Sequence, residues 1–155
     1  MKPPRVEACC VLTADGKVRP AGATPVAVRS WLRGIREGCD SIVRPPSSAR
    51  VALADAVRRA RGRRVLVEGG PRVIHALAAA GLLTHLHVAV LPVVSGGASF
   101  PTLLGPAASS LLRHSVDLRL QRFRLVEGAA LVTYSVLRPA KTASARTRSK
   151  LQDRA

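Results

Sequence analysis

The chain has 155 residues, of which 47% are hydrophobic and only 3% aromatic, and its formal net charge at pH 7 is +16. This length suits one domain with a sizeable core, and the hydrophobic content excludes an intrinsically disordered chain. The excess of basic residues favours anionic partners such as phosphates, nucleic acid or an acidic surface. No signal peptide is recognisable, and the longest apolar run, residues 88–94, is too short to span a bilayer, so we expect no membrane association.

The first half of the chain alternates strands with helices. The apolar run 6–13 predicts a strand that ends in a turn. Residues 24–36 predict a helix with Thr24 as its N-cap. A short strand follows at 41–43, and Ser47 or Ser48 can then cap a second helix that runs to Arg61.

The second half begins with a strand, a glycine pair and a helix. Residues 64–68 predict a buried strand. The next helix begins at Pro71 and ends at Gly81, in line with the preference for proline at the start of a helix and glycine at its end. Residues 86–94 predict another buried strand. We expect these two strands to be central neighbours in one sheet, joined by a right-handed crossover.

A β-hairpin closes the predicted domain. Residues 116–126 and 129–137 read as two strands joined at Glu127-Gly128, a strong turn signal. Alternating strands and helices followed by a hairpin predict an α/β fold, with a mostly parallel central sheet flanked by helices and an antiparallel hairpin at its C-terminal edge.

The cysteines and the end of the chain carry simpler expectations. Cys9, Cys10 and Cys39 make an odd set with no CxxC spacing, which predicts reduced thiols, a cytoplasmic location and no metal site. Residues 139–155 are basic and lack apolar periodicity, so we expect a disordered tail after a domain over 1–138.

The most informative segment is Glu68-Gly69-Gly70-Pro71. It carries a buried strand directly onto a helix N-terminus, where free N–H groups and the helix dipole favour an anion. With Pro71 lacking a donor, the N–H groups of Arg72, Val73 and Ile74 are expected to remain available. The simpler alternatives are a tight turn for the glycines and a salt bridge to an arginine for Glu68.

Several of these segments occur together in one known family. The run 65–71, Ala80-Gly81-Leu82-Leu83 and the stretch 86–97 resemble the C-terminal reductase domain of the bifunctional riboflavin-biosynthesis deaminase–reductase. Thr13-Ala14-Asp15-Gly16 resembles the Ser-Leu-Asp-Gly segment of that family. The resemblance covers most of residues 6–138 and implies a dihydrofolate-reductase-like fold.

The resemblance also implies a reaction and its partners. The family reduces the ribosyl group of a phosphorylated pyrimidine to a ribityl group with hydride from NADPH. It implies that Glu68, Thr13 and Asp15 bind the substrate. It further implies a cofactor site made of Gly69, Gly70, Pro71, Arg72, Val73, Ile74, His75 and Ala76. It assigns no catalytic residue.

The chain departs from the family pattern after Val43. The family continues there with a Gly-x-x-Thr motif and an Asp-Asp-Pro segment, whereas this chain passes through Arg44-Pro45-Pro46 into the next helix. We expect a mid-domain segment to be absent, with slow or lost catalysis as the consequence. The nicotinamide end of the site would then lack one side, which a homodimer partner could supply.

Two other functions compete with an active reductase. One is a degenerate homologue that no longer catalyses. The other is a basic nucleic-acid-binding protein, which the scarcity of aromatic residues and the lack of a DNA-binding motif disfavour. Among the remaining residues, His75 is expected to be partly exposed, and His85 and His87 lack a third metal ligand nearby.

Overall fold

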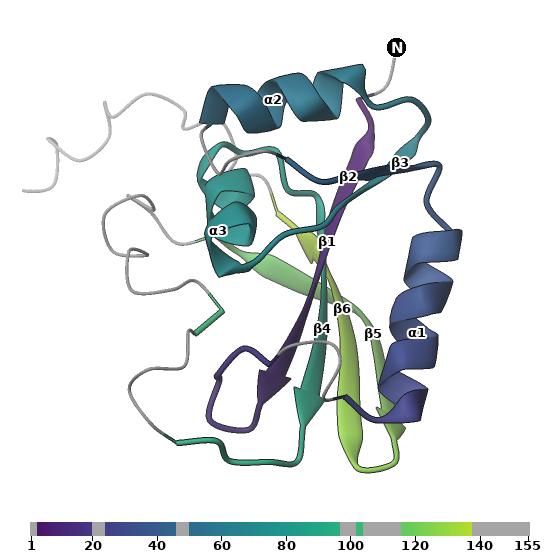
Figure 1. Ribbon diagram of the computed structural model, residues 1–155, viewed down its shortest axis with the longest axis vertical. Helices are drawn as coiled ribbons and strands as arrows, with labels where there is room; N and C mark the ends of the chain where they lie inside the picture. Colours follow the sequence, from purple (N-terminus) through teal and green to yellow (C-terminus); the bar gives the residue numbers. More distant parts are fainter. Residues whose placement is uncertain (1–2, 20–23, 46–49, 97–101, 104–115, 138–155) are drawn as a thin grey trace, which may run out of the picture.

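The computed structural model describes residues 3–19, 24–45, 50–96, 102–103 and 116–137. Within these ranges the chain forms three helices and six strands (Figure 1). In order they are β1 (Arg5–Thr13), α1 (Val26–Glu37), β2 (Ser41–Val43), α2 (Arg50–Arg59), β3 (Arg64–Val67), α3 (Pro71–Ala79), β4 (His85–Leu91), β5 (Leu118–Val126) and β6 (Ala129–Val136).

The strands form one sheet in the order β2-β3-β1-β4-β6-β5. The pairs β2–β3, β3–β1 and β1–β4 are parallel, whereas β6 pairs antiparallel with both β4 and β5. This arrangement confirms the predicted α/β fold with a mostly parallel sheet and a C-terminal hairpin.

The expectation that β3 and β4 are neighbours is wrong, because β1 lies between them. Both edges of β1 are paired, and seven of its nine residues are buried. A strand buried on both faces is most stable in the centre of a parallel sheet. The α3 crossover therefore spans one intervening strand.

Side chains alternate between two cores, one on each face of the sheet. On one face Val6, Ala8 and Cys10 of β1 pack with residues of α2 and α3, including Leu53 and Leu77. On the other face a smaller cluster joins β1, β4 and β6 to α1. Figure 1 shows α1 lying apart from α2 and α3. We call this second side the α1 face.

Helix α1 begins one residue later than its capping pattern suggests. Pro25, with an extended backbone, is the N-cap, and no side chain caps the helix, so the assignment of Thr24 as N-cap is wrong. The Thr24 carbonyl instead accepts a hydrogen bond from the Arg29 guanidinium at 2.9 Å. That charged donor ties the entering chain to the first turn of the helix.

The hairpin turn adopts the conformation its sequence predicts. Glu127 and Gly128 both have positive φ, 50° and 79°. This is the geometry of the two-residue turns whose twist matches that of antiparallel strands.

Some expectations lie outside the described residues. These are the Ser47-Ser48 cap, the end of the proposed 1–138 domain and the 139–155 tail. None of the helices in the described ranges is long and apolar enough to cross a lipid bilayer.

Candidate active site at the carboxyl edge of the sheet

Ligands of open α/β sheets bind beyond the carboxyl ends of the parallel strands. Thr13 ends β1 there, and its hydroxyl donates to Asp15 Oδ1 at 2.5 Å. The Asp15 carboxylate also accepts backbone N–H bonds from Ser95 at 3.2 Å and Gly96 at 3.0 Å. Asp15 therefore ties the loop after β1 to the loop after β4.

The same contacts fix the charge of Asp15. The hydrogen bond from Thr13, helped by the N–H groups of Ser95 and Gly96, lowers the pKa of the Asp15 carboxyl to about 2. Thr13 itself is buried, whereas Asp15 is exposed. At neutral pH Asp15 thus offers a fixed negative charge at the rim of the site.

The turn between β3 and α3 has two glycines with different roles. A Cβ on Gly69 would lie 2.6 Å from the Cβ of Val73, so only glycine allows α3 to begin so close to the strand. A Cβ on Gly70 would meet nothing within 4 Å. Gly70 is the N-cap of α3 and has extended backbone, with no side-chain cap on the helix. The turn is therefore packed on one side and open on the other.

Fewer donors are free at this helix start than the sequence suggests. The N–H groups of Val73 and Ile74 both donate to the Gly70 carbonyl, at 2.9 and 3.2 Å, so the expectation that they remain available is wrong. The carbonyl of an N-cap residue accepts the first intrahelical bonds. Among the described residues, the N–H groups of Gly69, Gly70 and Arg72 have no acceptor.

The side chains of α3 divide between the core and the solvent. Arg72 is exposed beside the open donors. Ile74, His75 and Ala76 are buried, and His75 is only 1% exposed, so the expected partial exposure of His75 is wrong. Its position on the core-facing side of the helix decides its burial. Of the described groups in the first turns of α3, the backbone and the Arg72 side chain can therefore reach an anion at this turn.

Glu68 is held by two arginines. Arg44 Nη2 lies 2.7 Å from Glu68 Oε2, and Arg36 Nε lies 3.3 Å from Glu68 Oε1. The carboxylate keeps 27% of its side chain exposed. The salt-bridge alternative for Glu68 is thus confirmed, and two arginines neutralise the carboxylate that directly follows β3.

The structure joins some of the predicted site residues and separates others. Thr13 and Asp15 are in contact, and the glycine turn directly follows Glu68. The β1–β3 register pairs Glu7 with Leu66, which puts Glu68 level with Cys9. Thr13 is four residues further along β1, about 13 Å at the rise of a parallel strand.

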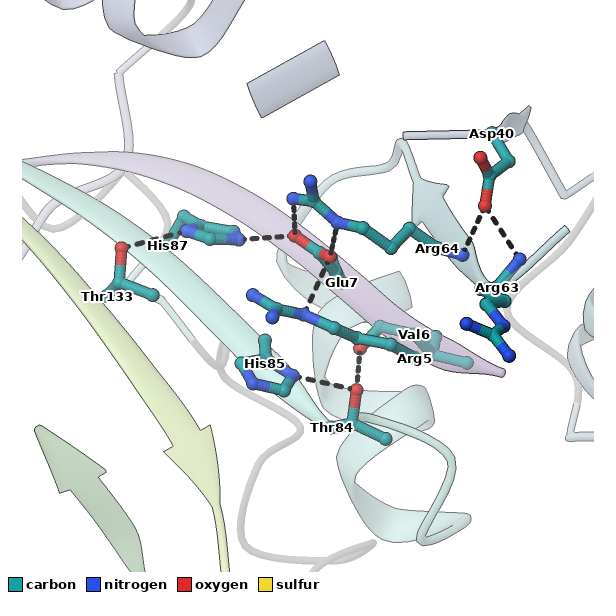
Figure 2. Close-up of polar contacts among 10 residues, drawn as sticks. All are labelled: Arg5, Val6, Glu7, Asp40, Arg63, Arg64, Thr84, His85, His87 and Thr133. Atoms are coloured by element: carbon teal, nitrogen blue, oxygen red, sulfur yellow. Dashed lines mark hydrogen bonds and ion pairs between the residues drawn. The ribbon is translucent and has the colours of Figure 1, made fainter. Parts of the chain in front are cut away.

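A second polar cluster, which the sequence did not indicate, lies near the amino ends of the strands. Glu7 of β1 is completely buried on the α1 face. Its carboxylate accepts hydrogen bonds from Arg64 Nε at 2.8 Å and His87 Nε2 at 2.7 Å, and Arg5 Nε lies 2.8 Å away. Figure 2 shows the three cationic or polar side chains converging on it. The only signal in the sequence was a lone glutamate inside an apolar strand.

His87 extends this cluster to β6. The Glu7 carboxylate only accepts, so His87 Nε2 must carry a hydrogen, while Nδ1 lies 3.0 Å from the Thr133 hydroxyl. Trp31 of α1 meets the His87 ring edge-on at 6.1 Å between centroids. Four strands and one helix thus contact a single buried network.

Burial alone raises the pKa of the Glu7 carboxyl, but its partners outweigh it. The hydrogen bonds from His87 and Arg64, with the charges of Arg5 and Arg64, lower that pKa to about 2. Glu7 is therefore ionised throughout the physiological range.

The described residues offer neither a metal site nor a reactive thiol. No group of three or more His, Cys, Asp or Glu side chains there is arranged to hold a metal. Cys9, Cys10 and Cys39 are all free, and burial raises the pKa of each thiol. None of the three is activated as a nucleophile.

The comparison with protein families identifies the chain. The model of the RibD C-terminal domain matches residues 23–127. The chain belongs to the RibD C-terminal domain family. The family comprises NADPH-dependent reductases of riboflavin biosynthesis that act on a pyrimidine substrate. A search of curated protein sequences found no significant match.

Solved structures support the fold at low sequence identity. A pyrimidine reductase-like protein from Corynebacterium diphtheriae has a TM-score of 0.71 at 12% identity, over 88% of this chain and 93% of that one. RibD from Acinetobacter baumannii has a TM-score of 0.63 at 12% identity, and the match spans 86% of this chain but only 58% of that one. Schistosoma mansoni dihydrofolate reductase has a TM-score of 0.55 at 7% identity, over 88% of this chain and all of that one. The fold is dihydrofolate-reductase-like.

The lowered pKa of Glu7 predicts an acid-labile contribution to stability. The folded-state value lies below the ordinary 4.5, so this stability is complete above about pH 5 and is lost as the pH falls towards 2. The difference corresponds to about 3 kcal/mol. Glu7→Gln should lower the unfolding free energy by about that amount at pH 7, measured by urea denaturation.

The matched control is Glu37→Gln, the same chemical change at an exposed position that ends α1. It should leave the free energy of unfolding unchanged. The gap between wild type and Glu7→Gln should close between pH 5 and 2. A gap that stays constant over this range would contradict the role of the Glu7 charge.

The two glycines of the turn should respond oppositely to substitution. Gly69→Ala should destabilise the fold by about 1–3 kcal/mol, because the new methyl group overlaps Val73. Gly70→Asp should leave stability unchanged or raise it by a few tenths of a kcal/mol, because aspartate is a good N-cap. Thermal unfolding of the two variants measures the difference, and equal melting temperatures would refute it.

Proposed function

We propose that the chain is an NADPH-dependent reductase that converts the ribosyl group of 5-amino-6-(5-phosphoribosylamino)uracil to a ribityl group. Its membership of the RibD C-terminal domain family carries this proposal. The open glycine turn at the carboxyl edge, with its free backbone donors, supports it.

The turn suits the pyrophosphate of the cofactor. The N–H groups of Gly69, Gly70 and Arg72 and the positive end of the α3 dipole favour a phosphate. Gly70 leaves room for close approach, and the Arg72 guanidinium adds a mobile positive charge. The segment from Gly69 to Ala76 is the proposed cofactor site, with the backbone of its first turn making the contacts.

The substrate would lie between the loop after β1 and the end of β3. Thr13 keeps the Asp15 carboxylate in one orientation, and Asp15 would accept hydrogen bonds from the pyrimidine or sugar. Glu68, oriented by Arg36 and Arg44, would contact the substrate from the end of the neighbouring strand β3. NADPH supplies the hydride, and these residues supply position and electrostatics.

One observation also favours a degenerate homologue. Arg44 forms an ion pair with the Glu68 carboxylate. In this chain Arg44 stands where the family sequence continues into its Gly-x-x-Thr motif. Hydride transfer needs the two carbons near contact, and about an ångström of misplacement costs on the order of a hundredfold in rate. We therefore propose weak NADPH binding and slow turnover.

The cofactor prediction compares Gly70→Asp with Gly70→Ala. Aspartate adds a negative charge where the phosphate would sit and caps the free N–H groups, so NADPH affinity should fall at least tenfold. Alanine adds only the methyl group and should weaken binding less. The measurement is nicotinamide fluorescence during NADPH titration, and equal affinities of wild type and Gly70→Asp would contradict the proposed site.

Turnover is measured by loss of NADPH absorbance with the phosphoribosylamino-pyrimidine. Glu68→Gln should lower the rate further if Glu68 contacts the substrate. Measurable turnover that is insensitive to Glu68→Gln would refute that role. Failure to bind NADPH at millimolar concentration would establish the degenerate homologue instead.

We further propose that the enzyme works in the cytoplasm as a homodimer. Its free thiols suit a reducing compartment. On the edge strand β5, four apolar side chains on the face opposite α1 are exposed: Leu118, Leu120, Phe123 and Leu125. An apolar stripe on an edge strand suits a second copy related by a twofold axis.

Light scattering should therefore give twice the monomer mass, and Phe123→Asp should halve it by placing a charge in the stripe. Val51→Asp, at an exposed apolar residue of α2, is the control and should leave the mass unchanged. A wild-type mass equal to the monomer would refute the dimer.

A further inference from the structure

A cleft of about 630 Å³ opens on the α1 face near the amino ends of β1, β3 and β4. It lies between the end of α1 and the β5–β6 hairpin. Its lining includes Arg5, Arg64, Arg122, Arg124, Trp31 and Gln121. The volume is in the range of pockets that bind small ligands.

The cleft carries a strong excess of positive charge. Four arginines line it, and no aspartate or glutamate does. The nearest carboxylate, Glu7, is completely buried beneath Arg5 and Arg64 and can compensate only one of these charges (Figure 2). Burial and the charge of Arg5 lower the pKa of His85, so the arginines supply the charge at neutral pH.

The hairpin side of the cleft is shaped by a β-bulge. The register between β5 and β6 shifts between Leu120 and Arg122. In a regular strand Gln121 and Arg122 would point to opposite faces, yet both line the cleft. Bulges redirect side chains in this way and are enriched next to binding sites. Within the described residues, Arg122 and Arg124 make no ion pair.

The floor of the cleft is held by Glu7. Arg64 donates hydrogen bonds from Nε and Nη2 to the Glu7 carboxylate, and Arg5 forms an ion pair with it through Nε. Their guanidinium groups are thereby fixed, with about two fifths of each side chain exposed. Among the described residues, Nη1 of Arg64 has no hydrogen-bond partner. Preorganised guanidinium forks match phosphate oxygens, because little side-chain entropy remains to be lost on binding.

We propose that this cleft binds a small ligand carrying two or more phosphate charges. The site is distinct from the proposed reductase site, because its lining includes neither Thr13, Asp15, Glu68 nor any residue of the glycine turn. Thr13 is six residues beyond Glu7 on β1, about 20 Å along the strand. The proposal does not depend on NADPH binding. It assigns a binding role to four of the chain's many basic residues, the arginines that line the cleft.

The single tryptophan of the chain makes the test direct. Trp31 lines the cleft, so its fluorescence should report occupancy. Inorganic pyrophosphate is the probe, titrated at moderate and at high salt, with stoichiometry from calorimetry. We expect saturable binding of one pyrophosphate per chain and weaker affinity at high salt.

Three variants locate the binding. Arg122→Gln/Arg124→Gln should weaken pyrophosphate affinity at least tenfold. The control, Arg59→Gln/Arg61→Gln, removes the same charge from exposed arginines at the end of α2 and after it, and should change affinity less than twofold. Gly70→Asp should also have little effect, because it alters only the carboxyl edge.

Each contrary result would overturn the proposal. Equal weakening by both double variants would mean nonspecific charge attraction. Loss of binding only in Gly70→Asp would place the anion at the glycine turn. Tighter binding of a short DNA duplex through Arg122 and Arg124 would indicate a nucleic-acid surface. An unchanged Trp31 signal with no calorimetric heat would exclude the site.

Discussion

The arrangement of the sheet depends on the contacts between the buried Glu7 carboxylate and its charged and hydrogen-bonding partners. A carboxylate without solvent exposure is costly unless charged and hydrogen-bonding partners surround it. Here Arg64 belongs to β3, His87 to β4 and Arg5 to β1 itself, and His87 reaches Thr133 on β6. A shift in the register of β3 or β4 would remove one partner of this charge, so the network favours the observed alignment of the sheet as well as stabilising it.

The two ends of the sheet perform different tasks because parallel strands present different groups at each end. At the carboxyl edge the chain leaves the strands in loops, where Asp15 joins two of them and the glycine turn exposes backbone donors. At the amino end the Glu7 network fixes two arginines at the floor of a cleft. The first arrangement suits the reductase chemistry of the family, and the second suits an anion held by side chains.

The glycine turn shows how local and tertiary requirements combine. Gly69 is required by packing, because Val73 of the following helix occupies the space of a side chain. Gly70 is free of such contacts, so its smallness matters only towards solvent or a ligand. In the Gly69-Gly70 pair, therefore, the first glycine is needed for packing and the second is available to a ligand.

The sequence alone determined the order of strands and helices, the hairpin at Glu127-Gly128 and the family, because periodicity, turn chemistry and motif spacing are local properties. It also indicated the glycine turn and the Thr13–Asp15 pair. The tertiary structure alone decided that β1 separates β3 from β4, that His75 is buried and that two arginines hold Glu68. It also brought Arg5, Arg64, Arg122 and Arg124 around one cleft. Such contacts join residues tens of positions apart, and only strand order and register determine which of many similar arginines meet one carboxylate.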